Sequence, residues 1–149
     1  MGCDIHAHTE IKVDGEWLYF ADNFITRNYT VFAKMAGVRS YDDIEPISEP
    51  RGLPDDISKM TRLHRKRWGA DGHSDSWLSF DEICELIDWL NVEMPEPKNR
   101  YYDWDSKWES VLLGETFYLF GNTLYYWKVY REDYPDFIED IRLVFWFDC

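Results

Sequence analysis

Alternation of side-chain type at both ends of the chain constrains its fold more than any other feature. Between Cys3 and Val13, every second position is apolar or small, and the positions between them carry Asp4, His6, His8, Glu10 and Lys12. Residues 141–148 set four large apolar residues at alternate positions against a mixed second set, which is Arg142, Val144, Trp146 and Asp148. Because successive side chains of a strand point to opposite faces of a sheet, each segment is predicted to be a strand with two different faces.

These two strands predict a single α+β domain that spans residues 1–149. We expect them to pair at the middle of an antiparallel or mixed sheet, with helices packed over one face. Asp14-Gly15 favours a hairpin turn, and residues 17–20 would return as the next strand. A hydrophobic content of 45% and an aromatic content of 18% are sufficient for one packed core and exclude a disordered chain.

Helical spacing of apolar residues marks several further segments. The predicted helices span residues 28–36, 58–68, 79–90 and most of 106–134. Ser58 can cap the second helix, and Ser79 with Glu82 forms a capping box at the start of the third. His64 lies on the apolar stripe of the second helix, which predicts a structural role. Residues 40–56, 69–77 and 92–105 are predicted to be loops or polar excursions.

Charge and cysteine content exclude several classes of protein. The net charge of −13, from 29 acidic and 16 basic residues, makes duplex DNA or RNA an unfavourable partner. Cys3, Cys84 and Cys149 are odd in number and widely spaced, which predicts neither a disulfide framework nor a zinc knuckle. With no signal-peptide pattern and no apolar run of membrane-spanning length, we expect a cytoplasmic protein with no membrane partner. A homo-oligomer remains open.

The polar face of the first predicted strand is one candidate site. Asp4, His6, His8 and Glu10 would follow one another at intervals of about 6–7 Å along that face. Asp-x-His and His-x-His pairs can chelate a divalent metal ion, and without a metal the same imidazoles could act as general acids or bases. The alternative is an ordinary sheet face turned to solvent.

The polar segment before the third predicted helix is a second candidate site. It offers carboxylates, an imidazole, hydroxyls and an indole within a few residues: Asp71, His73, Ser74, Asp75, Ser76 and Trp77. Gly69 and Gly72 would let the backbone turn sharply and approach a ligand. The alternative is an Asx- and Ser-rich turn that precedes a capped helix.

Basic residues cluster locally in this acidic chain. Residues 59–67 contain five of the 16 basic side chains, and most of these are interpreted as a solvated helix face. Arg51 lies instead in the Pro- and Gly-rich connection, and Arg27 lies near the first predicted helix. Both are candidates for contact with a phosphate or carboxylate on a small ligand.

Several motifs together resemble a set of small, mostly uncharacterised proteins of bacteriophages and bacteria. The resemblance rests on Met-Gly-Cys-Asp-Ile-His at the N-terminus, Arg27-Asn-Tyr with Phe32, residues 50–56, Trp68-Gly-x-Asp-Gly-His-Ser-x-Ser-Trp77 and residues 144–148. It is weak over residues 92–140. It implies that the N-terminal motif, Arg51 and the Asp71–Trp77 motif belong to one surface.

The chain departs from the family pattern at two histidines. Asp75 stands where the family often has a second histidine, and His8 is not part of the usual N-terminal motif. If the missing histidine is a ligand or proton carrier, this protein would either bind without turnover or use His8 instead.

The resemblance to small phage proteins implies a counter-defence role toward a nucleotide-like immune signal. The leading prediction is a hydrolase that cleaves a phosphodiester or related bond in such a molecule. The alternatives are a protein that sequesters the signal intact and an acidic inhibitor of a basic host protein. The predicted catalytic residues are His6, His73, Asp4 and Asp71, with His6 and His73 acting together. Arg51, Ser74, Ser76, Trp77 and Arg27 would bind the ligand, and Asp4, His6, His8 and Asp75 would hold a divalent metal if one is used.

Overall fold

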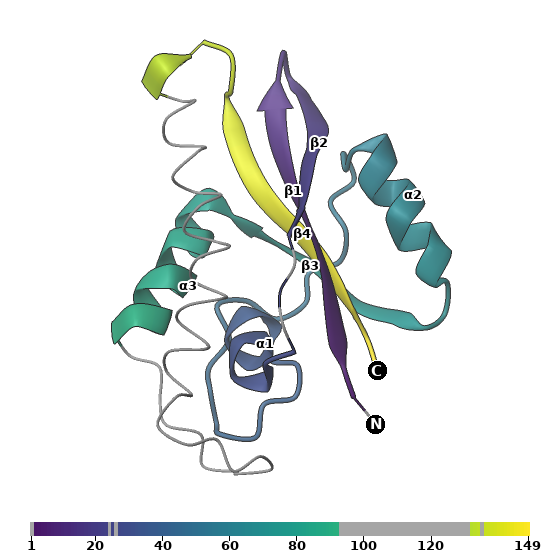
Figure 1. The fold of residues 1–149 in the computed structure, drawn as a ribbon, viewed down its shortest axis with the longest axis vertical. Helices are drawn as coiled ribbons and strands as arrows, with labels where there is room; N and C mark the ends of the chain where they lie inside the picture. Colours follow the sequence, from purple (N-terminus) through teal and green to yellow (C-terminus); the bar gives the residue numbers. More distant parts are fainter. Residues whose placement is uncertain (1, 24, 26, 93–131, 135) are drawn as a thin grey trace.

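Four antiparallel strands form the sheet in the part of the chain that the structure describes (Figure 1). This computed structural model describes residues 2–23, 25, 27–92, 132–134 and 136–149. The elements in chain order are β1 (Asp4–Val13), β2 (Glu16–Asn23), α1 (Tyr29–Ala36), α2 (Lys59–Trp68), β3 (Gly72–Ser79), α3 (Phe80–Val92) and β4 (Asp140–Asp148). The strand order is β2-β1-β4-β3, which confirms the α+β class and places the first and last strands together at the centre.

The pairing of β1 with β4 is continuous along both strands. Its register runs from Asp4 opposite Asp148 to Lys12 opposite Asp140 without a shift. Alternation therefore gives the two central strands matching faces. One face carries Ile5 opposite Phe147, and the other carries His6 opposite Trp146.

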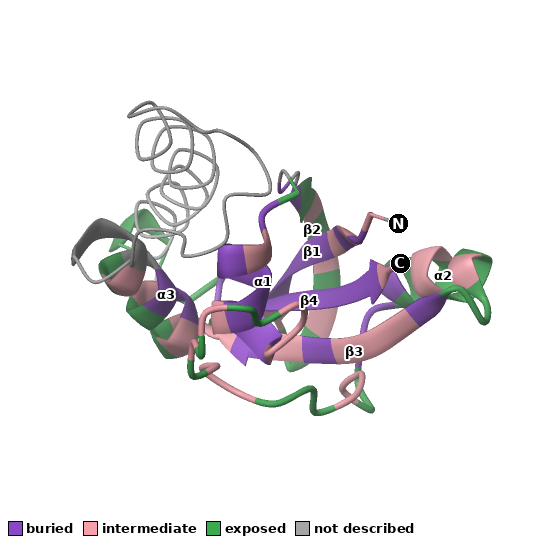
Figure 2. Ribbon diagram, turned by 90° about the horizontal axis from the view of Figure 1, so that it is seen from below, coloured by how far each residue is buried: buried purple, intermediate pink, exposed green. Residues whose placement is uncertain are grey.

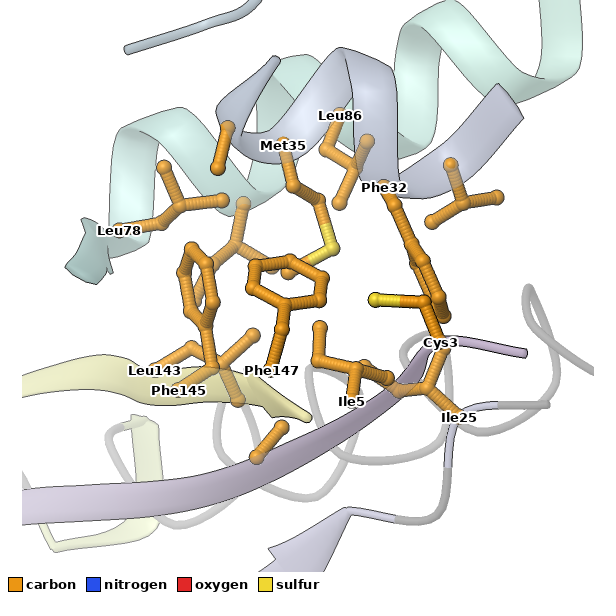
Figure 3. Close-up of a cluster of buried hydrophobic side chains, with 14 residues drawn as sticks. Cys3, Ile5, Ile25, Phe32, Met35, Leu78, Leu86, Leu143, Phe145 and Phe147 are labelled. Atoms are coloured by element: carbon orange, nitrogen blue, oxygen red, sulfur yellow. The ribbon is translucent and has the colours of Figure 1, made fainter. Parts of the chain in front are cut away.

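Helices α1 and α3 cover the apolar face and enclose the main core (Figures 2 and 3). Asn28 caps α1 by accepting hydrogen bonds from the backbone N–H groups of Thr30 and Val31, and Gly37 ends it in the left-handed conformation. The predicted capping box of Ser79 and Glu82 is present at the start of α3. The core consists of Cys3, Ile5, Ala7, Ile25, Val31, Phe32, Met35, Ala36, Leu78, Ile83, Leu86, Leu143, Phe145 and Phe147.

Helix α2 covers the opposite face of the sheet, where the sequence predicted no helix. Thr61 is buried in α2, whereas Met60 and Leu63 remain exposed, so apolar burial contributes little to its docking. Glu10 is fully buried beneath the start of this helix and accepts a hydrogen bond of 2.8 Å from the backbone N–H of Ser58. Arg142 lies opposite Glu10 on β4 and donates to it at 2.9 Å. The polar face is therefore an interior layer.

The prediction of a loop over residues 69–77 is wrong from Gly72 onward, where strand β3 begins. Gly72 to Ser79 pair with the free edge of β4, and this pairing satisfies backbone groups that a loop would leave open. A bulge between His73 and Ser76 interrupts the ladder, and Ser74 has a positive φ of 53° there. The Asx- and Ser-rich composition that suggested a loop belongs to this bulge.

A disulfide joins Cys3 to Cys149, although the number and spacing of the cysteines predicted no disulfide framework. The register of β1 and β4 continues by one position to bring these residues opposite each other. The predicted excursion at residues 92–105 begins with Val92, which ends α3, and the rest of it lies outside the described residues, as does most of the predicted helix at 106–134. No helix in the described part of the chain is both long and apolar enough to span a membrane.

Replacing Glu10 with Ala is expected to lower the free energy of unfolding by about 3 kcal/mol, because the buried Arg142 charge would keep only the solvent-exposed Asp56 carboxylate, at 2.8 Å, as an ionic partner. The double variant Glu10→Leu with Arg142→Met is expected to regain most of this loss. Urea unfolding of both variants tests this, with the exposed Glu16→Ala as control. A double variant as unstable as Glu10→Ala would contradict the expectation.

Candidate functional site

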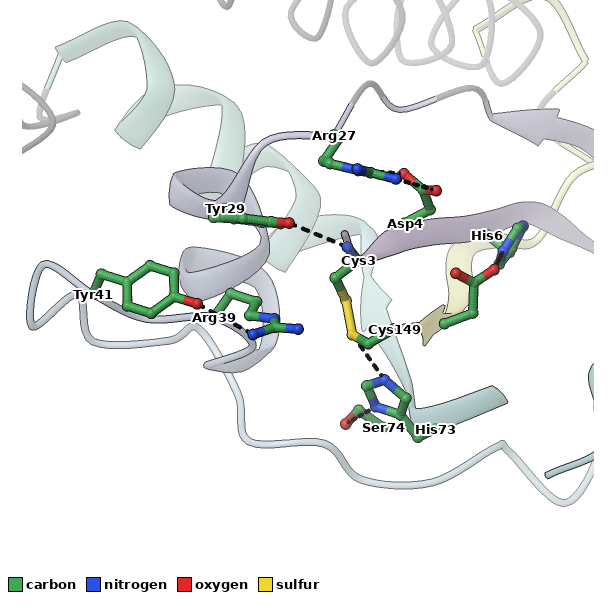
Figure 4. Close-up of a disulfide and its surroundings, with 11 residues drawn as sticks. Cys3, Asp4, His6, Arg27, Tyr29, Arg39, Tyr41, His73, Ser74 and Cys149 are labelled. Carbon is green, nitrogen blue, oxygen red and sulfur yellow. Dashed lines mark hydrogen bonds and ion pairs between the residues drawn. A yellow bond between two sulfur atoms is a disulfide. The ribbon is translucent and has the colours of Figure 1, made fainter. Parts of the chain in front are cut away.

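The two histidines predicted to act together lie on opposite faces of the sheet. His6 faces α2, where its ring lies 4.0 Å from that of Trp68 between centroids. His73 pairs with Phe147 and stacks over its ring on the face that carries the core. Figure 4 shows His73 beside Cys149 and His6 apart from both. The structure therefore does not bring His6 and His73 into one site.

Most of the other predicted site residues contact partners within the protein. Arg27 forms a two-pronged ion pair with Asp4, with distances of 2.8 and 2.7 Å, and this pair lowers the pKa of Asp4. Asp75 is held by Arg65 of α2 at 2.5 Å. Asp71 lies exposed in the turn before β3. These contacts favour structural roles for Asp4, Arg27 and Asp75.

Arg51 is also engaged rather than free for a phosphate. Its guanidinium binds both carboxylate oxygens of Glu82, at 2.6 and 3.2 Å, and lies 4.5 Å from the ring centroid of Trp77. Its backbone N–H donates to the buried Ser76 hydroxyl at 3.3 Å. Arg51 thus fastens the long loop before α2 to β3 and α3. Ser74 contributes its hydroxyl to a 3.0 Å contact with His73 Nδ1.

Three side chains converge beneath α2 in a way that the sequence did not predict. His8 Nε2 lies 3.2 Å from Asp22 Oδ1 and 3.4 Å from His64 Nδ1. The three donor atoms all lie within 4.8 Å of one another. His8 comes from β1, Asp22 from β2 and His64 from α2. His8 is 5% exposed, whereas the Asp22 side chain is 65% exposed, so the cluster opens to solvent on the Asp22 side.

The distances from His8 Nε2 to Asp22 and His64 match the spacing of ligand atoms around a small divalent ion. Donors about 2.0–2.1 Å from a tetrahedral ion lie about 3.3–3.4 Å from one another. Two imidazoles and a carboxylate are ligands that zinc commonly takes, and three protein ligands leave a fourth position for water or substrate. His8, Asp22 and His64 are therefore the residues that could hold a metal.

The protonation of His8 supports the same interpretation. Burial lowers the pKa of His8 to about 4, although the Asp22 carboxylate opposes the shift, so the ring is neutral at neutral pH. Its Nδ1 is buried with no hydrogen-bond partner among the described residues. If Nδ1 carries the proton, the lone pair of Nε2 points at Asp22 and His64, as coordination of a cation requires.

Aromatic and polar side chains surround this cluster. The rings of Tyr19 and Trp146 lie 5.4 and 5.0 Å from that of His8. The pKa of the Tyr19 hydroxyl is raised, mainly by burial and to a smaller extent by its interaction with the Asp22 carboxylate. His6 Nε2 lies 2.8 Å from Asp148 Oδ2, and its ring also stacks near Trp146. His6 and His8 thus share one aromatic-lined layer between the sheet and α2.

A β-bulge explains why sequence analysis missed Asp22. The hairpin begins with Val13 opposite Glu16, and an uninterrupted ladder would bring Ala21 opposite His8. The register shifts between Thr9 and Glu10, which places Asp22 opposite His8 instead. His64 was missed for another reason: its apolar neighbours on α2 suggested the core, whereas that face of α2 meets polar side chains of the sheet.

The described site offers a nitrogen- and oxygen-donor cluster, an adjacent histidine–carboxylate pair and aromatic walls. That combination suits metal binding and proton transfer beside a planar ligand. In comparisons with known proteins, no family model, no curated protein and no solved structure matches this chain.

Replacing Arg51 with Met is expected to lower the free energy of unfolding at neutral pH by about 1 kcal/mol. Burial alone would raise the pKa of Glu82, but hydrogen bonds from Arg51 and Ser79 outweigh it and lower the pKa below its ordinary value of 4.5. The stabilisation should therefore be complete above pH 4.5 and be lost as the pH falls through the folded-state pKa.

Urea unfolding at a series of pH values measures the difference between wild type and Arg51→Met. The exposed Arg67→Met serves as control and should differ little from wild type at any pH. A difference for Arg51→Met that stays constant into strong acid would show that Glu82 is not the group on which Arg51 acts.

Proposed function

We propose that this protein is a metal-dependent hydrolase that acts on a small, phosphate-containing, nucleotide-like molecule. The convergence of His8, Asp22 and His64 is the observation that carries the proposal. A neutral buried imidazole with an unpartnered second nitrogen, an imidazole from α2 and a solvent-facing carboxylate have few joint uses other than holding a cation. The predicted role of His8 as a metal ligand is kept, with Asp22 and His64 in place of Asp4, His6 and Asp75.

A divalent ion bound here would polarise a phosphoryl oxygen and lower the pKa of a coordinated water. The surrounding residues supply the rest of the chemistry. Asp148 holds the ring of His6 through Nε2, which orients His6 as a proton carrier beside the cluster. Tyr19 interacts with Asp22 and would orient its carboxylate.

Substrate class follows from the side chains at the end of α2. The ring of Trp68 lies against His6 and is partly exposed, so it offers a surface on which a base can stack. Lys66 and Arg67 share the last turn of α2 with Trp68, and both are exposed. A base beside Trp68 and a phosphate beside these cations would place the scissile bond toward the His8 cluster.

Zinc is expected to bind the oxidised protein at about one ion per chain, as three-ligand sites do. His8→Gln, Asp22→Asn and His64→Gln should each reduce the bound metal by at least about tenfold, because each removes one of three ligands. Elemental analysis after equilibrium dialysis measures the stoichiometry. Zinc should also raise the melting temperature of the wild type and not that of these variants.

Glu16→Gln is the matched control, since it removes an exposed carboxylate from the same strand as Asp22. It should keep one ion per chain. Zinc binding that survives in all three ligand variants would reject the site.

Hydrolysis is tested with substoichiometric zinc-loaded protein and candidate cyclic dinucleotides and ADP-ribose-type signals. The proposal expects products in excess of the protein, separated by chromatography, and a loss of at least about a hundredfold in rate for His6→Gln, which removes the proton carrier. Recovery of intact ligand after heating, with one ligand bound per chain, would show sequestration and contradict hydrolysis while leaving the metal site in place.

A further inference from the structure

We propose that Cys3 and Cys149 form a redox-active dithiol–disulfide pair, in which Cys149 is the reactive sulfur and His73 is its proton acceptor. This activity is independent of the His8 cluster, which lies on the other face of the sheet. Three features carry the proposal: the unequal exposure of the two cysteines, the contact of an imidazole with the sulfur of one of them, and the orientation of that imidazole.

The two cysteines differ in access. Cys3 is fully buried in the core, where Phe32 and Phe147 are its neighbours in the cluster, whereas Cys149 is exposed after the end of β4 (Figures 3 and 4). Exchange with an external thiol therefore has to begin at the Cys149 sulfur. Cys3 is then the internal thiol that attacks Cys149 when the disulfide forms again.

His73 contacts the exposed sulfur directly. Its Nε2 lies 3.1 Å from Cys149 Sγ, and its Nδ1 lies 3.0 Å from the Ser74 hydroxyl oxygen. When Nδ1 carries the proton and donates it to Ser74, the lone pair of Nε2 points at the sulfur. A disulfide sulfur has no proton to give to this lone pair, but a thiol does. The reduced pair is therefore the state that uses the imidazole, as a thiolate beside an imidazolium.

The bulge in β3 produces this arrangement. Ser74 adopts its positive φ between His73 and the point where the ladder resumes at Ser76. The hydroxyl is thereby turned back toward the preceding ring. Stacking of His73 over Phe147, with ring centroids 6.3 Å apart, fixes the other side of the imidazole.

Reduction proceeds with a small dithiol as the electron donor. One thiolate of the dithiol bonds to Cys149 Sγ, the bond to Cys3 breaks, and Cys3 leaves with the electron pair and takes a proton. The second thiol of the reagent gives its proton to His73 and attacks the reagent sulfur that is bonded to Cys149. Cys149 then leaves as a thiolate beside protonated His73. The dithiol becomes a cyclic disulfide, and the two electrons and two protons it loses reduce the protein. A small disulfide reverses the sequence.

Other charged groups near this pair have partners of their own. Asp4 on β1 is paired with Arg27, and Asp148 on β4 points to the opposite face and bonds to His6. Arg39, in the loop after α1, contacts the Tyr41 hydroxyl at 3.3 Å. The Tyr29 hydroxyl accepts from the Cys3 backbone N–H at 3.1 Å. Among the described residues, His73 is the titratable group in contact with Cys149.

The test uses the full chain with Cys84→Ser, which leaves two cysteines. Burial raises the pKa of the Cys84 thiol, so its loss removes a slow background reaction. Mass spectrometry after alkylation should find no modified cysteine before reduction and two after treatment with a dithiol. Addition of a small disulfide should restore the unmodified state. Thiols that stay free after that addition would overturn the proposal.

The role of His73 is tested by the alkylation rate of Cys149 in Cys3→Ser with Cys84→Ser, which needs no reduction. The rate should rise with a pH midpoint below the ordinary thiol value of about 8.5, and His73→Gln should return the midpoint to that value and slow the reaction about tenfold at neutral pH. Tyr41→Phe, a nearby loss of one hydroxyl, should change neither. With folding checked by circular dichroism, an unchanged midpoint in His73→Gln would leave the disulfide a purely structural bond.

Discussion

The unbroken pairing of β1 with β4 is the constraint on which the rest of the structure depends. Because its register has no shift, several side chains on β1 meet suitable partners on β4: Ile5 meets Phe147, His6 meets Trp146 and Glu10 meets Arg142. A slip by one residue would turn each set to the wrong face. The same register brings Cys3 opposite Cys149. Both proposed chemical sites therefore follow from how these two strands align.

Burial of the polar face makes the position of α2 depend on directional contacts. The helix meets the sheet through the Ser58 contact with Glu10, the His64 contact with His8 and the Trp68 contact with His6. Hydrogen bonds and ring contacts fix an orientation more narrowly than apolar packing does, because they are lost at small displacements. This helix can therefore present His64 to His8 at the distance that coordination requires.

Much of the fold could be predicted from the sequence because its strongest signals are local. Alternation identified β1 and β4, and caps identified the start of α2 and α3. The position of α2 over the polar face could not be predicted, since polar residues on a strand usually face solvent. Arg51 binds Glu82 rather than being free for a ligand. This contact joins residues 31 positions apart, which sequence spacing does not reveal.

Prediction of the candidate site also depended on whether a signal was local to one element or arose from contact between elements. His8 was identified because alternation placed it beside His6 on one face. Asp22 was not, because one extra residue in β2 changes which side chain lies opposite His8. His73 was singled out for its polar neighbours, yet the sulfur that its Nε2 contacts belongs to Cys149, which is 76 positions away. Spacing along one element is readable from sequence, whereas contacts between elements depend on bulges and on tertiary packing.

The bond between Cys3 and Cys149 also changes the topology of the molecule, since the two residues are 146 positions apart. In the oxidised state, this bond and the backbone from Cys3 to Cys149 together close a covalent ring. A single cut by a protease anywhere between the two cysteines opens the ring without releasing a fragment. The first and last strands would stay tethered, and the centre of the sheet would remain one molecule until the bond is reduced.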